Sequence, residues 1–383
     1  MTVVGTRPEI IRLSATIKLL DKYTKQVFVH TGQNYDYELN EIFFEDLELR
    51  KPDHFMNIDA SSLGSSVGDI IKKTEELINI EVPDALLVLG DTNSCLSAYI
   101  AKRKHIPIFH MEAGNRCFDL NVPEEVNRKI IDHIADFNLV YTEHARRHLI
   151  SEGLSHRRIY LTGSPMWEVL QQNREKIDNS GIIHQLNKRN NNKMLIEPKK
   201  YFIISIHREE NVDNGNNLKK ILKVLNNLAM KYDYPVVIST HPRTRKRIEE
   251  HGLKQQLDAR LHFMKPFGFN DYIHLQKNAL CCISDSGTIS EESAMLNFPA
   301  ISLRQSMERP EAQDAGTIIL TGFDPDTVLN AIATVIEEHK DTTISSQLPV
   351  EYLVDNTSWR VVKLILGNTR LSNKWHGIHG FEN

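Results

Sequence analysis

Three acidic residues in the first half of the sequence stand where acid–base chemistry could take place. Asp91 and Glu112 each follow a short apolar run, and Glu124 opens a segment with helical period. If the apolar runs are parallel strands, these carboxylates converge at one sheet edge, where grouped acids are costly unless they are used. The pattern predicts proton transfer at this edge. The alternative is an ordinary surface pair of Glu124 with Arg128, four residues later.

A polar segment in the second half, Asp285-Ser286-Gly287-Thr288, is suited to binding a phosphate. It lies where an apolar run passes into a helical segment, and the free amides at a helix start attract anions. Gly287 would let the ligand approach the backbone closely. Glu292, one turn further on, could accept hydrogen bonds from ribose hydroxyls. A capping box made by Ser286 or Thr288 with a downstream Glu explains the same pattern, so both interpretations stay open.

Arg7 and His207 follow the first strand-like run of each half. A planar guanidinium at a helix start suits a diphosphate, because it can donate two parallel hydrogen bonds. His207 could contact a leaving phosphate. The alternatives are that Arg7 pairs with Glu9 or a helix end, and that His207 is a hydrogen-bonded structural residue.

These residues need a scaffold that gathers the ends of many strands. Short apolar, β-branched runs alternate with segments of helical period, which predicts βαβ units and parallel sheets. Nearly every run ends in a polar cluster, and ligands of open parallel sheets bind beyond the carboxyl ends of the strands. The predicted strands are Thr2–Val4, Gln26–His30, Ala85–Leu89, Ile106–His110, Phe137–Tyr141, Ile159–Leu161, Tyr201–Ile206, Pro235–Ser239, Leu261–Met264, Ala279–Ser284, Pro299–Leu303 and Thr317–Leu320.

The alternation is interrupted by the Asn- and Lys-rich segment 171–200, which predicts a linker with a loosely ordered excursion. The predicted fold class is therefore α/β, with one domain at residues 1–170 and a second at residues 201–345. Residues 346–383 are predicted to form a final helix and a frayed tail.

Composition and charge exclude several classes of protein. The 383 residues carry 46 Lys and Arg against 50 Asp and Glu, a net charge of −4 without a basic tract, which argues against a nucleic-acid partner. No apolar run approaches the ~20 residues that span a bilayer, and no leader sequence is recognised, so no membrane partner is expected. The 4 cysteines show no CxxC spacing, which predicts a reducing, cytoplasmic location with the thiols as small core residues.

No cofactor is expected. The sequence contains neither G-x-G-x-x-G nor GxxxxGK, the fingerprints of dinucleotide and P-loop sites. His144 and His148 have the i,i+4 spacing of metal ligands, but their charged neighbours indicate an exposed helix face. The sequence therefore predicts neither NAD nor a metal.

The motifs, taken in order, resemble those of the non-hydrolysing UDP-N-acetylglucosamine 2-epimerases. They are GTRPE, TGQNYD, GDTNS, HMEAGNR, PEEVNR, HREENVD, THPR, SDSGTISEE and MERPEA, and they span about Gly5 to Gly316. The resemblance implies a glycosyltransferase-B-like architecture, in which two Rossmann-like domains turn their parallel sheets toward a central cleft. It also implies a C-terminal helix that packs back on the N-terminal domain, and a homodimer.

Carried over position by position, the resemblance implies which residues bind and which react. Contacts to a UDP-2-acetamido sugar are implied for Arg7, Arg12, Phe267, Tyr272, Ser286, Gly287, Thr288, Glu292 and Arg309. Catalytic roles are implied for Asp91, Glu112, Glu124 and His207. The carboxylates belong to the N-terminal domain, and UDP is held mainly by the second domain.

The chemistry of a 2-acetamido sugar agrees with these roles. The proton on C2 has no adjacent carbonyl, and transient oxidation would need a nicotinamide, so the remaining route breaks the C1–O bond first. UDP leaves, and a carboxylate removes the C2 proton to give a 2-acetamidoglycal. Reprotonation on the other face and return of UDP complete the inversion.

The sequence departs from the commonest family pattern in three places. Arg12 stands where many members have Lys, and Asn34 replaces a His in a region tied to activation by a second substrate molecule. The loop 117–122, in GNRCFDLNVPEE, resembles the branch that converts UDP-2-acetamido-2,6-dideoxy-L-talose to UDP-N-acetyl-L-fucosamine for capsule or O-antigen synthesis. We expect this activity, with UDP-GlcNAc/UDP-ManNAc interconversion as the alternative. A glycosyltransferase and a non-catalytic nucleotide-sugar sensor on the same fold are further alternatives.

Overall fold

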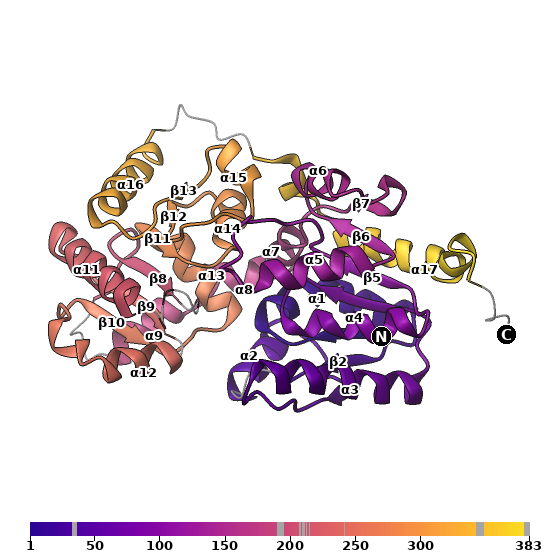
Figure 1. Cartoon of the computed structure of the whole chain (residues 1–383). Coiled ribbons are helices and arrows are strands. Elements are labelled where there is room, and N and C mark those ends of the chain that lie inside the picture. Colours follow the sequence, from indigo (N-terminus) through magenta and orange to yellow (C-terminus); the bar gives the residue numbers. More distant parts are fainter. Residues whose placement is uncertain are drawn as a thin grey trace. The chain divides into compact units, whose positions relative to one another are not determined.

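A computed structural model describes residues 1–32, 37–189, 195–206, 208, 211, 213, 215–240, 242–341 and 348–378. The chain divides into two compact units. The first contains Met1–Gln172 and Val350–Asn383, and the second contains Asn173–Pro349. Figure 1 shows the chain with its elements labelled, and each unit has a parallel sheet of its own.

The first unit is built on a seven-stranded parallel sheet in the order β3-β2-β1-β4-β5-β6-β7. The central strands are buried along their whole length, as expected for a sheet covered on both faces. The strands are β1 (Thr2–Val4), β2 (Phe28–His30), β3 (His54–Phe55), β4 (Leu86–Leu89), β5 (Ile108–Met111), β6 (Phe137–Val140) and β7 (Ile159–Leu161).

The helices of the first unit fall into two groups. They are α1 (Arg7–Tyr23), α2 (Tyr37–Asp46), α3 (Leu63–Glu81), α4 (Ser97–Arg103), α5 (Glu124–Ile134), α6 (Glu143–Ser151), α7 (Met166–Gln172) and α17 (Thr357–Trp375), with 3₁₀ turns η1 (Asn93–Leu96), η2 (His156–Arg158) and η4 (Val350–Leu353). Helices α3, α4 and α5 lie side by side (Figure 1), and α1 contacts α2, α7 and α17. The C-terminal helix α17 thus packs on the first helix, where the rings of Trp359 and Tyr23 are 5.4 Å apart.

The second unit contains a six-stranded parallel sheet in the order β10-β9-β8-β11-β12-β13. Its strands are β8 (Phe202–Ile206), β9 (Val236–Thr240), β10 (Leu261–Met264), β11 (Cys281–Ser284), β12 (Ala300–Ser302) and β13 (Ile319–Leu320). Its helices are α8 (Arg174–Asp178), α9 (Ile182–Arg189), α11 (Gly215–Tyr232), α12 (Pro242–Glu250), η3 (Leu253–Gln256), α13 (Phe269–Asn278), α14 (Ile289–Leu296), α15 (Pro310–Asp314) and α16 (Pro325–Glu338).

The core of the second unit lies on both faces of its sheet. Phe202 and Ile204 of β8 belong to one buried apolar cluster, which includes residues of α11 and α16. Ile203 belongs to another cluster, with residues of α9, α13 and α14. Successive side chains of a strand point to opposite faces, so a strand with apolar residues at every position must be covered twice.

The structure confirms the predicted class of two parallel-sheet α/β domains, and every predicted strand segment overlaps an observed strand. It differs in the described part of the segment 171–200, where a linker is expected, whereas residues 190–194 of the predicted excursion lie outside the described residues. Helices α8 and α9 pack on α13 in the second unit, because Ile177, Ile182 and Leu186 are buried there. The short strand β3 is also absent from the predicted set.

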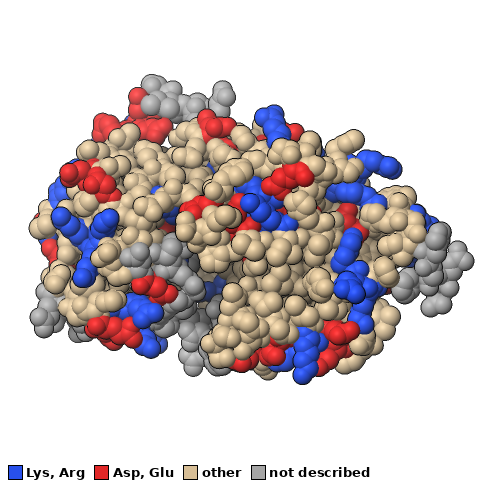
Figure 2. All heavy atoms as spheres, viewed as in Figure 1, with Lys and Arg blue, Asp and Glu red and all other residues tan. Residues whose placement is uncertain are grey.

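The surface is of mixed charge over most of the viewed face. Figure 2 shows Lys and Arg side chains interspersed with Asp and Glu. None of the helices in the described part of the chain is long and apolar enough to cross a membrane.

Candidate active site

The order of strands reverses once in each sheet, beside the first strand of that unit. In the first unit β1 lies between β2 and β4, and in the second unit β8 lies between β9 and β11. Ligands of open α/β sheets bind beyond the carboxyl ends of the strands at such a point. Arg7 and Asp91 follow β1 and β4, and Ser286 follows β11. These three predicted residues therefore stand at the position that this topology favours.

Asp91 is held at the end of β4 by helix α5. Its Oδ2 accepts hydrogen bonds from Nε and Nη2 of Arg128, at 3.0 and 2.5 Å, and its side chain is 20% exposed. The Asn127 side chain also donates to the backbone oxygen of Asp91, at 3.0 Å. Arg128 is buried, and an ordinary surface pair with Glu124 would not by itself account for these contacts with Asp91.

Glu112 follows β5 in a strained backbone conformation. Its φ of 64° lies in the left-handed region, which residues other than glycine rarely adopt and which is often kept at functional sites. Its carboxylate pairs with the guanidinium of Arg12 and accepts a hydrogen bond from the Asn115 amide at 3.3 Å. Strands β4 and β5 are hydrogen-bonded neighbours, so Glu112 stands beside Gly90, the residue before Asp91.

Arg12, expected to contact the substrate, is buried below this carboxylate. It is 2% exposed, and its guanidinium carbon lies 5.8 Å from the centre of the Tyr141 ring. A buried arginine that is paired with a carboxylate fixes the direction of that carboxylate. The structure thus places Arg12 as the support of Glu112.

Glu124 is the first residue of α5, one turn before Asn127 and Arg128. Since Asn127 and Arg128 both contact Asp91, the start of this helix is fixed at the end of β4. A helix start also favours negative charge. The three predicted carboxylates therefore come from adjacent structural positions, the ends of β4 and β5 and the start of α5.

A fourth carboxylate at this edge, Glu9, is not among the predicted site residues. It is 2% exposed, and it accepts hydrogen bonds from the backbone N–H groups of Gly5 and Thr6 and from the hydroxyls of Thr6, Thr92 and Ser94. Burial raises the pKa of Glu9, and the hydrogen bonds, which act to lower this pKa, only partly offset the effect. Glu9 ties the loop after β1 to the loop after β4, and the capping-box spacing from Thr6 to Glu9 was the signal that could have found it.

A buried network supports the turn that carries Glu112. His110 Nε2 contacts the carbonyl oxygen of Gly90 at 2.9 Å, and its Nδ1 lies 3.0 Å from Asp132. Asp132 also accepts hydrogen bonds from the Gly114 N–H and from Arg116. Burial opposes ionisation of Asp132, but His110 and Arg116 outweigh it and lower its pKa.

Arg7 begins α1, directly after β1 and Gly5-Thr6. Its guanidinium carbon lies 5.7 Å from the centre of the Phe43 ring of α2. Stacking on an aromatic ring leaves the edge of a guanidinium able to donate in plane. This placement is compatible with the predicted contact to a diphosphate.

The loop after β11 in the second unit is compact. The hydroxyls of Ser286 and Thr288 are 3.0 Å apart, and Thr288 precedes the first turn of α14. A Cβ atom at Gly287 would stand 3.0 Å from Glu308 Oε2, so only glycine fits this position without moving that carboxylate. The loop thus presents small residues and a helix start, as the phosphate interpretation requires.

Two buried arginines, Arg304 and Arg309, and the partly buried Arg208 hold this loop in place. Arg309 donates from Nε to the Gly287 carbonyl at 3.1 Å and pairs with Glu291 at 3.3 Å. Arg304 and Arg208 both pair with Glu308, at 2.9 and 3.2 Å.

Arg208 also contacts the first residue of the loop, Asp285. Its backbone N–H and its Nε donate to the Asp285 carboxylate and carbonyl, each at 3.0 Å. Sequence reasoning selected Arg309 but missed Arg208, Arg304 and Glu308. Two of these lie inside the quoted motifs HREENVD and MERPEA.

Tyr272 and Glu292 lie close together in the second unit. Burial, with Cys282 and Glu292 nearby, raises the pKa of Tyr272 well above its usual value, and Ser205 is its hydrogen-bond partner. Glu292 accepts a hydrogen bond from Gln276 at 2.8 Å. Phe267 packs in the same apolar cluster as Tyr272. The phenol is therefore neutral and able to donate a hydrogen bond.

Two of the predicted features cannot be placed. His207 and Asn34 lie outside the described residues.

Among the residues that are described, no three His, Cys, Asp or Glu side chains are arranged to hold a metal ion. The cysteines are only partly as expected, because three are buried in the core while Cys117 is half-exposed on the loop before α5.

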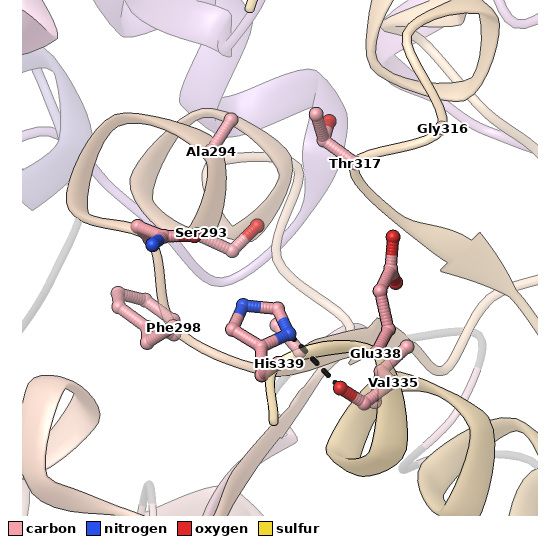
Figure 3. A pocket seen from close by; sticks show the side chains of 10 residues that line it. Ser293, Ala294, Phe298, Gly316, Thr317, Val335, Glu338 and His339 are labelled. Atoms are coloured by element: carbon pink, nitrogen blue, oxygen red, sulfur yellow. Dashed lines mark hydrogen bonds between the residues drawn. The ribbon is translucent and has the colours of Figure 1, made fainter. Parts of the chain in front are cut away.

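Two hollows in the structure lie away from these residues. A cavity of about 30 Å³ lies between α14 and α16. Figure 3 shows its lining, in which the His339 ring lies near Ser293 and Phe298. The cavity has the space of one or two water molecules. A groove of about 490 Å³ follows β7 and α17. None of the predicted site residues lines either hollow.

Comparison with known proteins gives consistent matches over most of the chain. The sequence model of one family, described as UDP-N-acetylglucosamine 2-epimerase, matches residues 19–366. The UDP-N-acetylglucosamine 2-epimerase of Methanococcus maripaludis is 37% identical over 343 residues, which cover 88% of this chain and 92% of that protein.

Solved structures agree. The structure of UDP-N-acetylglucosamine 2-epimerase from Rickettsia bellii is 47% identical, with a TM-score of 0.89 and 98% of both chains covered. The structure of the Methanocaldococcus jannaschii UDP-GlcNAc 2-epimerase, in complex with UDP-GlcNAc and UDP, is 32% identical with a TM-score of 0.87, and covers 96% of this chain and 99% of that one.

Proposed function

We propose an activity from the premise that this chain belongs to the UDP-N-acetylglucosamine 2-epimerase family. The proposed reaction is inversion at C2 of a UDP-linked 2-acetamido sugar, without hydrolysis of the nucleotide. One observation carries the proposal. Asp91 and Glu112 stand at the ends of adjacent strands, and each is held by a buried arginine. Such grouped and supported carboxylates are expected where protons are moved.

The reaction proceeds by elimination and re-addition. The C1–O bond breaks and its electron pair leaves with UDP, a carboxylate takes the proton from C2, and a C1=C2 double bond forms. The resulting 2-acetamidoglycal receives a proton at C2 from the opposite face, and UDP returns to C1. Asp91, Glu112 and Glu124 share the acid–base steps. This route consumes no redox equivalent and needs neither NAD nor a metal.

The nucleotide is assigned to the second unit together with Arg7. Ser286, Gly287 and Thr288 bind the diphosphate with Arg7 and His207, and Arg309 fixes their loop through the Gly287 carbonyl. Phe267 and Tyr272 contact the uracil, and Glu292 accepts from the ribose. The helix start at α14 and the guanidinium stabilise the charge of leaving UDP.

We further propose that the sugar is UDP-2-acetamido-2,6-dideoxy-L-talose, converted to UDP-N-acetyl-L-fucosamine for capsule or O-antigen synthesis in the cytoplasm. The support is the loop 117–122, which joins the turn after Glu112 to Glu124. Its Phe118 and Leu120 are 72% and 74% exposed. Exposed apolar side chains on a loop that ends at Glu124 suit a sugar with a methyl group at C6 better than one with a hydroxyl.

The test is to supply both candidate substrates to the purified protein and to follow C2 inversion by proton NMR. We expect turnover of the L-talose derivative and little turnover of UDP-GlcNAc. Turnover of UDP-GlcNAc to UDP-ManNAc alone would contradict the choice of sugar and leave the 2-epimerase class intact. UDP release that depends on an added acceptor would contradict the class itself.

A homodimer is the proposed assembly. Exposed apolar residues on α4 and α5 support it, namely Tyr99, Val126 and Ile130 at 43%, 51% and 42% exposure. Helices α4 and α5 contact each other, so these exposed residues come from neighbouring elements. Exposed apolar surface of this kind marks protein–protein contacts in soluble chains.

A further inference from the structure

We infer that Arg128 is a positioning residue for Asp91, and that it couples the loop before α5 to the acid–base group at the end of β4. The inference rests on the proposed function. Arg128 is assigned no contact with the substrate, and it acts by fixing the direction of the Asp91 carboxylate.

The first support is the geometry of the fork. Nε and Nη2 of Arg128 both donate to one oxygen of Asp91, Oδ2, at 3.0 and 2.5 Å. The Arg128 side chain is 4% exposed and the Asp91 side chain 20% exposed. Two donors on a rigid plane hold this carboxylate oxygen in place, which a single point charge does not.

The second support is a carboxylate that anchors Arg128 from behind. Nη1 of Arg128 donates to Glu125 Oε2 at 2.8 Å, and Glu125 is fully buried. The same oxygen accepts hydrogen bonds from the backbone N–H and the thiol of Cys117, at 3.1 and 3.2 Å. Burial opposes ionisation of Glu125, but Cys117 and Arg128 outweigh it and lower its pKa.

These contacts form one continuous chain from Cys117 through Glu125 and Arg128 to Asp91. Cys117 opens the loop that ends at Glu124, so a displacement of this loop is transmitted to the acid–base group. Catalytic groups must be held within about half an ångström of their productive position, and a misplacement of about 1 Å can cost roughly 10²-fold in rate. A buried arginine between two carboxylates provides this restraint.

The test compares Arg128→Met and Arg128→Lys with the wild-type protein. The readouts are exchange of the C2 proton of the UDP-sugar in heavy water, KM, and UDP affinity by calorimetry. We expect kcat of Arg128→Met to fall by about 10²-fold, with KM and UDP affinity within about threefold of wild type. Added guanidinium ion should restore part of the rate. Arg128→Lys should keep the charge but lose the fork, and so give an intermediate kcat.

The matched control is Arg50→Met. Arg50 also bridges two carboxylates of the first unit, Asp21 and Asp53, each at 2.8 Å, but it lies at the surface near β2 and β3. We expect wild-type kcat for this variant. If Arg128 had only a structural role, Arg128→Met and Arg50→Met would behave alike, and guanidinium would rescue neither variant.

The outcomes separate the inference from the proposed function. Folded Arg128→Met with wild-type exchange would overturn the inference and leave the proposed function standing. If Arg128→Met does not fold, Arg128→Lys decides, since full kcat in that variant would show that the fork is not needed. Absence of exchange in the wild-type protein with either UDP-sugar would overturn the proposed function, and the inference with it.

Discussion

At the scale of single residues, the two carboxylates that follow strand ends are each paired with a buried arginine. Asp91 is paired with Arg128, Glu112 with Arg12, and Glu124 begins the helix that carries Arg128. The proposed mechanism requires all three to be ionisable, whereas the folded structure requires only that their hydrogen bonds be made. Replacing a carboxylate by its amide separates these two requirements.

We therefore predict that Asp91→Asn, Glu112→Gln and Glu124→Gln each lower kcat by about 10²–10⁴-fold, the usual contribution of a general acid or base. UDP affinity, measured by calorimetry, should stay near wild type. Glu75→Gln is the control, because Glu75 is 52% exposed and pairs with Lys104. Any of the three variants with more than half of the wild-type rate would remove that residue from the acid–base group.

A second prediction at this scale concerns His30 and pH. His30 is fully buried, its Nδ1 accepts a hydrogen bond from the Gly32 N–H, and burial lowers its pKa from 6.5 to about 4. Between these values the unfolded chain binds a proton that the folded chain does not. The free energy of unfolding therefore falls as pH drops from 6.5 to 4, by about 3 kcal/mol for a shift of this size.

Urea unfolding at pH 7 and pH 4 measures this effect. The wild-type protein should lose about 3 kcal/mol more than His30→Gln over this range, because the variant has no group to protonate at this position. Equal losses in the two proteins would contradict a neutral, buried His30.

At the scale of elements, the turn after β5 depends on its packing against α6. Gly114 has φ 81°, and a Cβ atom there would overlap the carbonyl oxygen of Ala145 and lie 2.9 Å from its carbonyl carbon. His148 of α6 in turn contacts the Gly114 carbonyl at 3.0 Å. The turn that carries Glu112 thus has no room for a side chain at its glycine.

We predict that Gly114→Ala lowers the free energy of unfolding by about 2–5 kcal/mol, from backbone strain and overpacking together. Gly153→Ala is the matched control. Gly153 has a similar φ of 87° but no atom within 4 Å of the added Cβ, so only the strain of about 1–2 kcal/mol applies. Equal losses in urea unfolding would show that the contact with α6 does not restrict the turn.

The elements themselves were largely predictable. Strands buried on both faces need unbroken apolar runs, and such runs were found for every strand except β3, whose two residues His54 and Phe55 are half-exposed. Helices α8 and α9 were missed because Ile177, Ile182 and Leu186 stand apart from one another among polar residues. Their apolar surface becomes evident only against α13.

The site was predictable only where it follows a strand end. Asp91 and Glu112 are found in this way, but their arginine partners lie 37 and 100 residues away along the chain. The i,i+4 spacing of Glu124 and Arg128 is visible in the sequence, whereas the contact of Arg128 with a distant strand end is not. The left-handed conformation of Glu112 has no sequence signal, since the residue is not glycine.

At the scale of the whole molecule, the surface of the first unit is uneven. Figure 2 shows an area over α4 and α5 that is almost free of charged side chains. Val126 and Ile130 lie one turn apart on α5, and Tyr99 lies on the neighbouring α4. The other side of α5 holds Arg128 and Glu125, so a partner on this surface would press on the helix that supports Asp91.

We predict that Val126→Glu combined with Ile130→Glu converts the dimer to a monomer in sedimentation velocity, because charge cannot be buried unpaired in an interface. Met230→Glu, at a residue of α11 that is 60% exposed, should leave the dimer intact. A wild-type protein that is monomeric at micromolar concentration would contradict the proposed assembly. If the double variant were still a dimer, the interface would have to lie on another surface of the protein.

The central claim is that carboxylates of the first unit exchange the proton on C2 of a UDP-linked 2-acetamido sugar. The most direct measurement is to incubate the wild-type protein with the accepted UDP-sugar in heavy water and to examine the product by NMR. The account predicts a product inverted at C2 that carries deuterium at that carbon. An inverted product that retains the original hydrogen at C2 would contradict it.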